Sequence, residues 1–248
     1  MTPIEECIIN KETKVNPVWL MRQAGRYLPE FRRIRKQNIN FINLCLNENL
    51  SSEITLQPIR RFNLDAAIIF SDILMLPYGL GQEVEFKKNF GPQLGLLNIE
   101  KISKTSEVDF LNKLNPVYKS INNVSNTNLL NNKNLIGFVG APWTLLVYMI
   151  NKNSPKKELI KNFFRDELLI KETLLILKKF LKLHINHQIK NGANVIQIFD
   201  SWAGLLEEKD LPNYVYIPTL NLVNYVKSLN IPVICFPRGV KNYKNYCD

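Results

Sequence analysis

The stretch LIGFVGAPWTLLVYMI, residues 135–150, is the part of the sequence that best indicates the fold. It carries no charged side chain, yet it is shorter than the ~20 apolar residues that a membrane-spanning helix needs, and Gly137, Gly140 and Pro142 interrupt it. A short apolar run that ends at turn residues is typical of a strand buried on both faces. We therefore predict a buried strand over 135–139 that leads through a turn into a helix, and no membrane span.

Four other short apolar runs end as abruptly in polar or turn residues, at 18–21, 66–70, 195–199 and 233–236. Between them lie segments with the 3.6-residue apolar spacing of amphipathic helices, at 51–62, from 156 to about 189, and at 219–229. The Asn-rich segment 122–134 is typical of a surface connection. Because strands that alternate with helices form parallel sheets with right-handed crossovers, we predict an α/β fold. Five strands suit an open doubly wound sheet or most of a (β/α)8 barrel.

Composition and charge limit the class of protein. With 248 residues, 46% of them hydrophobic, the chain can bury a sizeable core. Its net charge of +10 fits nucleic acid, an anionic membrane surface or an acidic small substrate, but it also fits a general lysine bias, since 23 Lys stand against nine Arg. Five of those nine lie between Arg22 and Arg35. Because the planar guanidinium suits bidentate binding of carboxylates, this cluster favours an acidic small substrate over nucleic acid.

The cysteines and the first residues indicate the cellular compartment. Cys7, Cys45, Cys235 and Cys247 are far apart and show the spacing of neither a zinc site nor a disulfide framework. The segment MTPIEE at 1–6 is acidic where a secretory signal is basic, and no apolar segment follows it. We expect a cytoplasmic protein.

Polar or turn residues follow each of the five predicted strands, at the position where parallel α/β folds bind ligands. They are RQAGR at 22–26, SD at 71–72, GAPW at 140–143, DSW at 200–202 and PRG at 237–239. The pattern predicts a pocket with guanidinium groups on one wall and the Asp72 carboxylate nearby, which suits a polyanion that carries N–H donors. Structural roles stay open: Asp72 could cap a helix, Arg22 and Arg26 could pair with Glu30 on a solvated face, and Ser201 could serve in a turn.

Other motifs do not point to a cofactor or to covalent catalysis. His184 and His187 lie three residues apart on the long predicted helix, a spacing that could hold a metal, but no third ligand is nearby and we expect a plain helix surface. The sequence contains no G-x-G-x-x-G or P-loop pattern, no serine nucleophile elbow and no isolated Cys–His set.

The motif PVWLMRQAGRYLPEFRRIR, residues 17–35, closely resembles the N-terminal signature of uroporphyrinogen decarboxylases. Three further blocks follow in the family's order and spacing: LQPIRRFNLDAAIIFSDIL at 56–74, GFVGAPWTLLVYMI at 137–150 and GANVIQIFDSWAGLL at 192–206. The resemblance implies a distorted (β/α)8 TIM-type barrel, usually dimeric, that removes the four acetate carboxyls of uroporphyrinogen III and gives coproporphyrinogen III in haem biosynthesis. It implies a carboxy-lyase without metal or organic cofactor, and no nucleic-acid or membrane partner. The family continues beyond PVICFPRG at 232–239, so we expect one barrel domain over 1–248 that is incomplete at the C-terminus and lacks the last strands.

The resemblance also implies roles for individual residues. In this family the aspartate at the position of Asp72 accepts hydrogen bonds from the pyrrole N–H groups and stabilises the cation formed when a pyrrole carbon is protonated. The loop of Arg22, Gln23, Ala24, Gly25 and Arg26 binds substrate carboxylates, and Arg22 is also a candidate proton donor. Arg35, Tyr148 and Ser201 resemble further substrate contacts. The chemistry agrees, because decarboxylation needs an electron sink, and a protonated pyrrole held beside a negative charge provides one.

Two other functions stay open at the level of sequence. One is a truncated, non-catalytic homologue that binds a tetrapyrrole. The other is a corrinoid-linked methyltransferase of the same superfamily, whose chemistry uses a zinc bound by thiolate and histidine; this sequence supplies no suitable cluster.

Overall fold

A four-stranded parallel sheet forms the centre of the protein in a computed structural model that describes residues 1–11, 16–87, 89–155 and 158–247. The strands lie in the order β1-β4-β5-β6. They are β1 (Ala66–Ile68), β4 (Asn134–Gly140), β5 (Val195–Asp200) and β6 (Val233–Pro237). The first three are buried along nearly their whole length, and β6 is half-buried. The fold is therefore α/β with a parallel sheet, as the sequence predicts.

The two faces of the sheet pack against different partners, because successive side chains of a strand point to opposite sides. One face contributes Val139 and Ile198 to the main hydrophobic core. The other face contributes Ile136 to a small cluster closed by Ile4 of α1 (Pro3–Asn10). Toward the carboxyl ends of the strands, this second face borders the main cavity described below.

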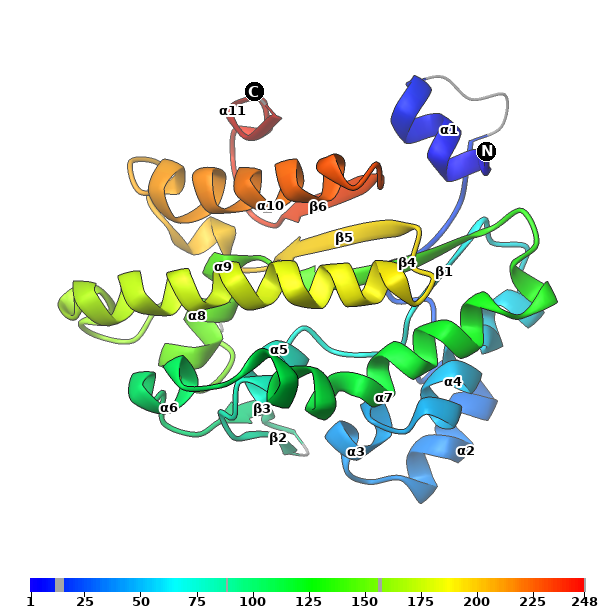
Figure 1. The fold of residues 1–248 in the computed structure, drawn as a ribbon, viewed down its shortest axis with the longest axis horizontal. Coiled ribbons are helices and arrows are strands. Elements are labelled where there is room, and N and C mark those ends of the chain that lie inside the picture. The colour runs from blue at the N-terminus through cyan, green and yellow to red at the C-terminus, as the bar shows by residue number, and fades with distance from the viewer. Residues whose placement is uncertain (12–15, 88, 156–157, 248) are drawn as a thin grey trace.

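Long helices cover the face that carries the main core (Figure 1). Helix α4 packs on α7, α7 on α9, and α9 on both α8 and α10. Their bounds are α4 (Glu48–Arg61), α7 (Glu107–Ser125), α8 (Pro142–Asn151), α9 (Glu167–Lys190) and α10 (Ile217–Ser228). Ser106 begins α7 by accepting a hydrogen bond from the backbone N–H of Asp109 at 3.0 Å, and Asp166 begins α9 in the same way from Leu169 at 2.9 Å.

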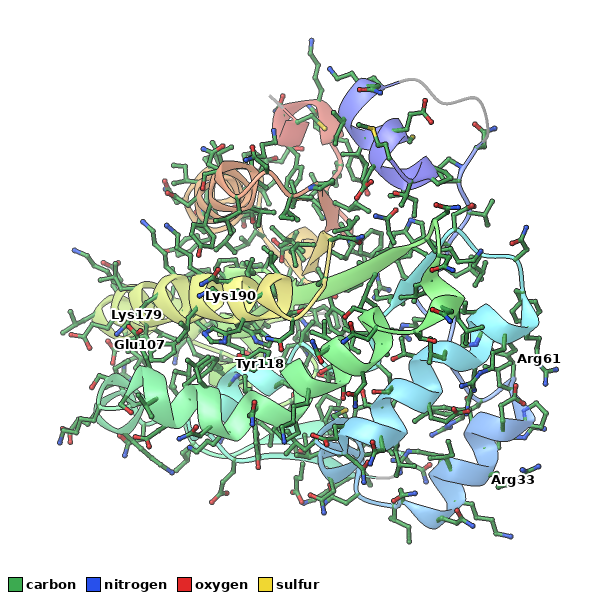
Figure 2. The ribbon with its side chains drawn as sticks, turned by 45° about the vertical axis from the view of Figure 1, so that its right-hand side comes forward. Arg33, Arg61, Glu107, Tyr118, Lys179 and Lys190 are labelled. Atoms are coloured by element: carbon green, nitrogen blue, oxygen red, sulfur yellow. The ribbon has the colours of Figure 1, made fainter. Side chains whose placement is uncertain are left out.

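Polar contacts also join α7 to α9, and Figure 2 labels three of the residues involved, Glu107, Tyr118 and Lys179. Glu107 and Lys179 form an ion pair at 2.9 Å. Further along, the Tyr118 hydroxyl lies 3.0 Å from Nδ1 of His184. Burial lowers the pKa of His184 to about 3, so the ring is neutral at pH 7. His184 is therefore a buried packing residue, and the expectation of a plain helix surface is wrong for it.

Short elements connect the sheet and the long helices. A hairpin is formed by β2 (Val84–Lys87) and β3 (Gly91–Leu94), which pair antiparallel. The others are α2 (Pro29–Gln37), α3 (Phe41–Cys45), α5 (Met75–Gly79), α6 (Ile99–Ser103), η1 (Asn128–Leu130), η2 (Phe163–Arg165), η3 (Ala203–Leu205), the π-helical η4 (Pro212–Tyr216) and α11 (Tyr243–Cys247). Helices α1 and α11, at the two ends of the chain, both lie along the top of the view in Figure 1. Among the described helices, none has the length and apolar character needed to span a bilayer.

Four of the five predicted strands are confirmed, and the run at 18–21 is not a strand. Val18 and Leu20 are 53% and 56% exposed. The run contacts the sheet edge through Trp19, which packs against the cluster that contains Ala66 of β1, and through Asp65, whose N–H donates to the Val18 carbonyl at 2.9 Å and whose carboxylate accepts from the Val18 N–H at 2.6 Å. The helices predicted at 51–62 and 219–229 are present with small shifts. The long helix begins at Glu167, after the η2 turn, and not near 156, which lies outside the described residues. The predicted connection at 122–134 starts inside α7, which ends at Ser125.

Candidate functional site

A cavity of about 670 Å³, the main cavity, lies at the carboxyl ends of the sheet strands. Residues from the ends of all four strands line it, together with the segment before α2 and the β2–β3 hairpin. They are Leu20, Met21, Arg22, Ser71, Asp72, Ile73, Leu74, Phe86, Pro92, Phe138, Tyr148, Phe199, Ser201, Phe236 and Arg238. The structure therefore brings together four residues that the sequence singled out separately, namely Arg22, Asp72, Tyr148 and Ser201.

Asp72 is the carboxylate of the main cavity. It follows β1, and its Oδ1 accepts a hydrogen bond from the backbone N–H of Leu74 at 2.9 Å. Burial raises the pKa of Asp72 to about 6, against the opposing effects of that hydrogen bond and of the positive charge on Arg22. The carboxyl is thus mostly ionised at pH 7, yet poorly solvated. A negative charge held in this way favours a ligand that brings N–H donors or positive charge.

Tyr148 and Ser201 reach the cavity from α8 and from the turn after β5. The Tyr148 ring packs edge-on against Trp202 with centroids 5.8 Å apart. Burial raises the pKa of the Tyr148 phenol, and the charge of Asp72 raises it further, so the hydroxyl keeps its proton at neutral pH. Tyr148 can therefore donate a hydrogen bond to an anionic group in the cavity.

A buried network fixes the backbone around Ser201. The Thr144 hydroxyl donates to Oδ1 of Asp200 at 2.6 Å and accepts from the backbone N–H of Trp202 at 3.1 Å. Asp200 is 0% exposed and its Oδ2 has no hydrogen-bond partner among the described residues. Burial raises the pKa of Asp200 to about 7. Asp200 is therefore buried behind the cavity wall, where its hydrogen bond with Thr144 stabilises the turn that contains Ser201.

The loop 22–26 divides into residues that reach the main cavity and residues that do not. Arg22 lines it, whereas Gln23 is only 1% exposed: its Oε1 accepts from the Leu20 N–H at 3.1 Å and its amide donates to the Ala66 carbonyl at 2.8 Å. Gln23 thus anchors the loop to β1. Ala24 lines an adjoining hollow of about 150 Å³ together with Arg22.

Gly25, Arg26 and Arg35 do not line the main cavity, although the sequence placed them in the site. The Gly25 carbonyl accepts a hydrogen bond from the Leu28 N–H at 3.0 Å at the start of α2, and Arg26 is exposed. Arg35 donates to the Ile39 carbonyl at 2.7 Å, and its guanidinium lies 5.5 Å from the ring centre of Phe41. Burial and the nearby charge of Arg26 lower the pKa of Arg35.

The contacts also show which of the alternative structural roles of Asp72, Arg22, Arg26 and Ser201 are present. Glu30 pairs with Arg61 at 3.0 Å, so the alternative pairing of Glu30 with Arg22 or Arg26 is not formed. The Asp72 carboxylate accepts a hydrogen bond from the backbone of Leu74, but Leu74 is itself the N-cap of α5, which begins at Met75, so Asp72 is not the cap of that helix. Ser201 does lie in a turn, and it lines the cavity as well.

Eleven of the fifteen lining residues were not among the predicted site residues, and four of these lie on β4, β5 and β6 or directly after β6. Phe138, Phe199 and Phe236 form an aromatic floor from the cavity-facing side of β4, β5 and β6, and ring pairs connect Phe199 to both others. Arg238 follows β6 directly. Its place after the fifth apolar run was the signal that could have found it, because every such position borders the same end of the sheet. Within the described ranges, no group of three His, Cys, Asp or Glu side chains is placed to hold a metal ion.

Comparisons with a family model and with known protein sequences point to the same family. A family model described as "Uroporphyrinogen decarboxylase (URO-D)" matches residues 2–246. Proteins named uroporphyrinogen decarboxylase are similar in sequence: one from Campylobacter jejuni is 41% identical over 99% of this chain and 73% of its own length, and one from Rickettsia bellii is 43% identical over 90% of this chain and 66% of its own. The chain thus spans about two thirds to three quarters of these relatives. Among solved structures, a methyltransferase from Methanosarcina mazei matches with a TM-score of 0.68 at 16% identity, over 90% of this chain and 65% of that one, which shows a shared fold.

Proposed function

Because this chain belongs to the uroporphyrinogen decarboxylase family, we propose that it acts as a carboxy-lyase that removes the four acetate carboxyls of uroporphyrinogen III to give coproporphyrinogen III in porphyrin biosynthesis. The observation that carries the proposal is the Asp72 carboxylate, ionised at neutral pH and placed among aromatic side chains in a cavity of about 670 Å³. Four pyrrole N–H groups converge at the centre of such a substrate. A single carboxylate is the acceptor that they require.

The chemistry follows from a positive charge that forms on the substrate. A proton adds to the pyrrole α-carbon next to the ring carbon that bears the acetate arm, and the ring becomes cationic. The electrons of the bond to the carboxylate then flow into the ring, CO2 leaves, and the remaining methylene takes a proton while the ring carbon gives up its own. The cation is the high-energy species, so a fixed negative charge beside it lowers the barrier. We assign that role to Asp72.

Positive groups around Asp72 suit the substrate's eight carboxylates. Arg22 lines the cavity, and we propose that it binds carboxylates and stands close enough to supply a proton. Tyr148 and Ser201 add hydroxyl donors. Gln23 and Gly25 stabilise the loop through hydrogen bonds to backbone groups. Arg26 and Arg35 raise the positive potential near it.

We further propose that the parallel sheet belongs to a (β/α)8-type barrel and that the chain is one domain of that kind. The strand order β1-β4-β5-β6 with helices on one face supports this. The family resemblance supports a cytoplasmic homodimer that needs no metal or organic cofactor, with the small acidic substrate as its ligand and neither nucleic acid nor membrane as a partner.

Anaerobic incubation with uroporphyrinogen III tests the proposal. Products are oxidised to porphyrins and separated by their number of carboxyl groups. We expect species with seven, six, five and finally four carboxyls, with one CO2 released for each carboxyl lost. Binding of uroporphyrinogen III without loss of any carboxyl would overturn the decarboxylase function and favour a non-catalytic tetrapyrrole-binding protein.

A further inference from the structure

A second, smaller pocket adjoins the main cavity at the end of β6, and we call it the side pocket. Its volume is about 150 Å³, and it is lined by Ser201, Trp202, Gly204, Leu205, Arg238 and Gly239. Ser201 and Arg238 line the main cavity too. The side pocket is therefore an extension that a side chain of a bound ligand can enter.

Two turns that lock together hold Arg238 in place. Its backbone N–H donates to the Asp200 carbonyl at 3.0 Å, and its own carbonyl accepts from the Gly204 N–H at 3.0 Å. A Cβ on Gly204 would lie 2.6 Å from the carbonyl oxygen of Gly239, and Gly239 itself has a φ of +82°. Only glycine allows this close approach, so the backbone under the Arg238 side chain is fixed by packing.

The charge of Arg238 is available to a ligand. Arg60 and Arg61 form ion pairs with Glu53 and Glu30, whereas Arg238 forms none within the part of the chain that the structure describes. A strand end that only needed a solvated positive charge would be served by Lys, which this chain uses more than twice as often as Arg. The guanidinium adds the planar fork that binds both oxygens of a carboxylate.

The sheet order places Arg238 across the main cavity from Asp72. Asp72 follows β1 and Arg238 follows β6, and these strands are the two edges of the sheet. Three strand spacings of about 4.8 Å separate the edges by roughly 14 Å. A ligand whose centre lies over Asp72 therefore meets Arg238 with its periphery.

We infer that the side pocket is a carboxylate subsite in which Arg238 binds one acidic side chain at the edge of the substrate, opposite the Arg22 side. The inference rests on the proposed function, because it takes its ligand from the polycarboxylate that the main cavity would hold. Ser201, shared by both pockets, adds a hydroxyl donor to the same carboxylate. Arg238 is thereby a binding residue that sets the orientation of the macrocycle.

Equilibrium binding of uroporphyrinogen III under anaerobic conditions tests the subsite. The variants are Arg238→Gln, Arg238→Lys and, as a matched control, Arg165→Gln, which removes the same charge from an exposed arginine outside both pockets. We expect Arg238→Gln to weaken binding tenfold or more, Arg238→Lys to weaken it less, and Arg165→Gln to change it by less than twofold. Thermal unfolding should be unaltered in all three, because Arg238 forms no ion pair among the described residues.

The outcomes separate the subsite from the proposed function. If the unaltered protein binds uroporphyrinogen III and Arg238→Gln binds it as well as Arg165→Gln does, the subsite is wrong and the proposed function stands. Equal weakening by both Gln variants would also refute the subsite, since it would reflect overall charge alone. If the unaltered protein does not bind uroporphyrinogen III, the proposed function itself fails, and the subsite falls with it.

Discussion

Replacing Asp72 with Asn should stabilise the protein at neutral pH. The carboxylate is held with a pKa of about 6 instead of 3.8 because the cavity wall removes water from it. That difference corresponds to roughly 3 kcal/mol at full burial, and since Asp72 is only half-buried by surface area, we expect Asp72→Asn to gain about 1–3 kcal/mol at pH 8. The amide oxygen of Asn can still accept the hydrogen bond from Leu74.

The sign of the pH dependence follows from the direction of the shift. The folded state binds the proton of Asp72 more tightly than the unfolded state does. Protonation of Asp72 therefore contributes to the stability of the folded protein fully below about pH 3.8, and this contribution is lost as the pH rises through about 6. The gain of the variant over the unaltered protein should therefore be largest at pH 8, roughly half as large at pH 5, and smaller still at lower pH.

Urea unfolding of both proteins at pH 5 and pH 8 measures this difference directly, provided that the slope with urea is the same for both. Because every other titrating group is shared, only Asp72 contributes to the change between the two pH values. If Asp72→Asn is less stable than the unaltered protein at pH 8, or if its gain in stability does not depend on pH, then burial of the ionised Asp72 carboxylate does not destabilise the folded protein and the argument is refuted.

Three further substitutions test the surroundings of the site. Thr144→Val should lower the free energy of unfolding in urea by roughly 2–4 kcal/mol at pH 8, because it leaves the Asp200 carboxylate without its hydrogen-bond donor. The loss should be smaller at pH 5, because Asp200, whose pKa is already about 7, is then protonated. Equal losses at both pH values would contradict this. Tyr118→Phe should lose about 1 kcal/mol of stability with turnover unchanged, since only the hydrogen bond to His184 disappears; a fall in turnover would show that the α7–α9 contact matters to the site. Arg26→Ala should raise KM roughly threefold or more at low salt and leave kcat little changed, because the exposed guanidinium attracts an acidic substrate from outside the cavity. High salt should reduce this effect on KM. An unchanged KM at low salt would show that Arg26 takes no part in substrate recognition.

The core strands could be predicted because parallel strands buried on both faces are continuous apolar runs. The run at 18–21 has the same composition, yet Val18 and Leu20 remain exposed, since burial depends on a neighbouring element and not on the run itself. The β2–β3 hairpin was missed because VEFK at 84–87 alternates half-buried and exposed positions and carries two charges. The start of α9 was misplaced by about ten residues, although Asp166 followed by Glu167 is a recognisable helix start.

The site was partly visible in the sequence for a geometrical reason. Arg22, Asp72 and Ser201 all follow predicted strands, and in a parallel sheet such positions meet at one edge. Sequence could not show that Gln23 turns inward to bind the backbone of β1, or that Arg35 binds a carbonyl just beyond its own helix, because both depend on where neighbouring segments pack.

The central claim is that Asp72 supplies the charge that stabilises a cationic substrate. The measurement that tests it most directly is single-turnover release of CO2 from uroporphyrinogen III by the unaltered protein and by Asp72→Asn, each with enough protein to bind all the substrate. We predict that Asp72→Asn binds uroporphyrinogen III and loses nearly all CO2 release, because the neutral amide cannot offset the charge of the protonated pyrrole. Release within about tenfold of the unaltered rate, equivalent to less than about 1.4 kcal/mol of barrier, would contradict the role of Asp72.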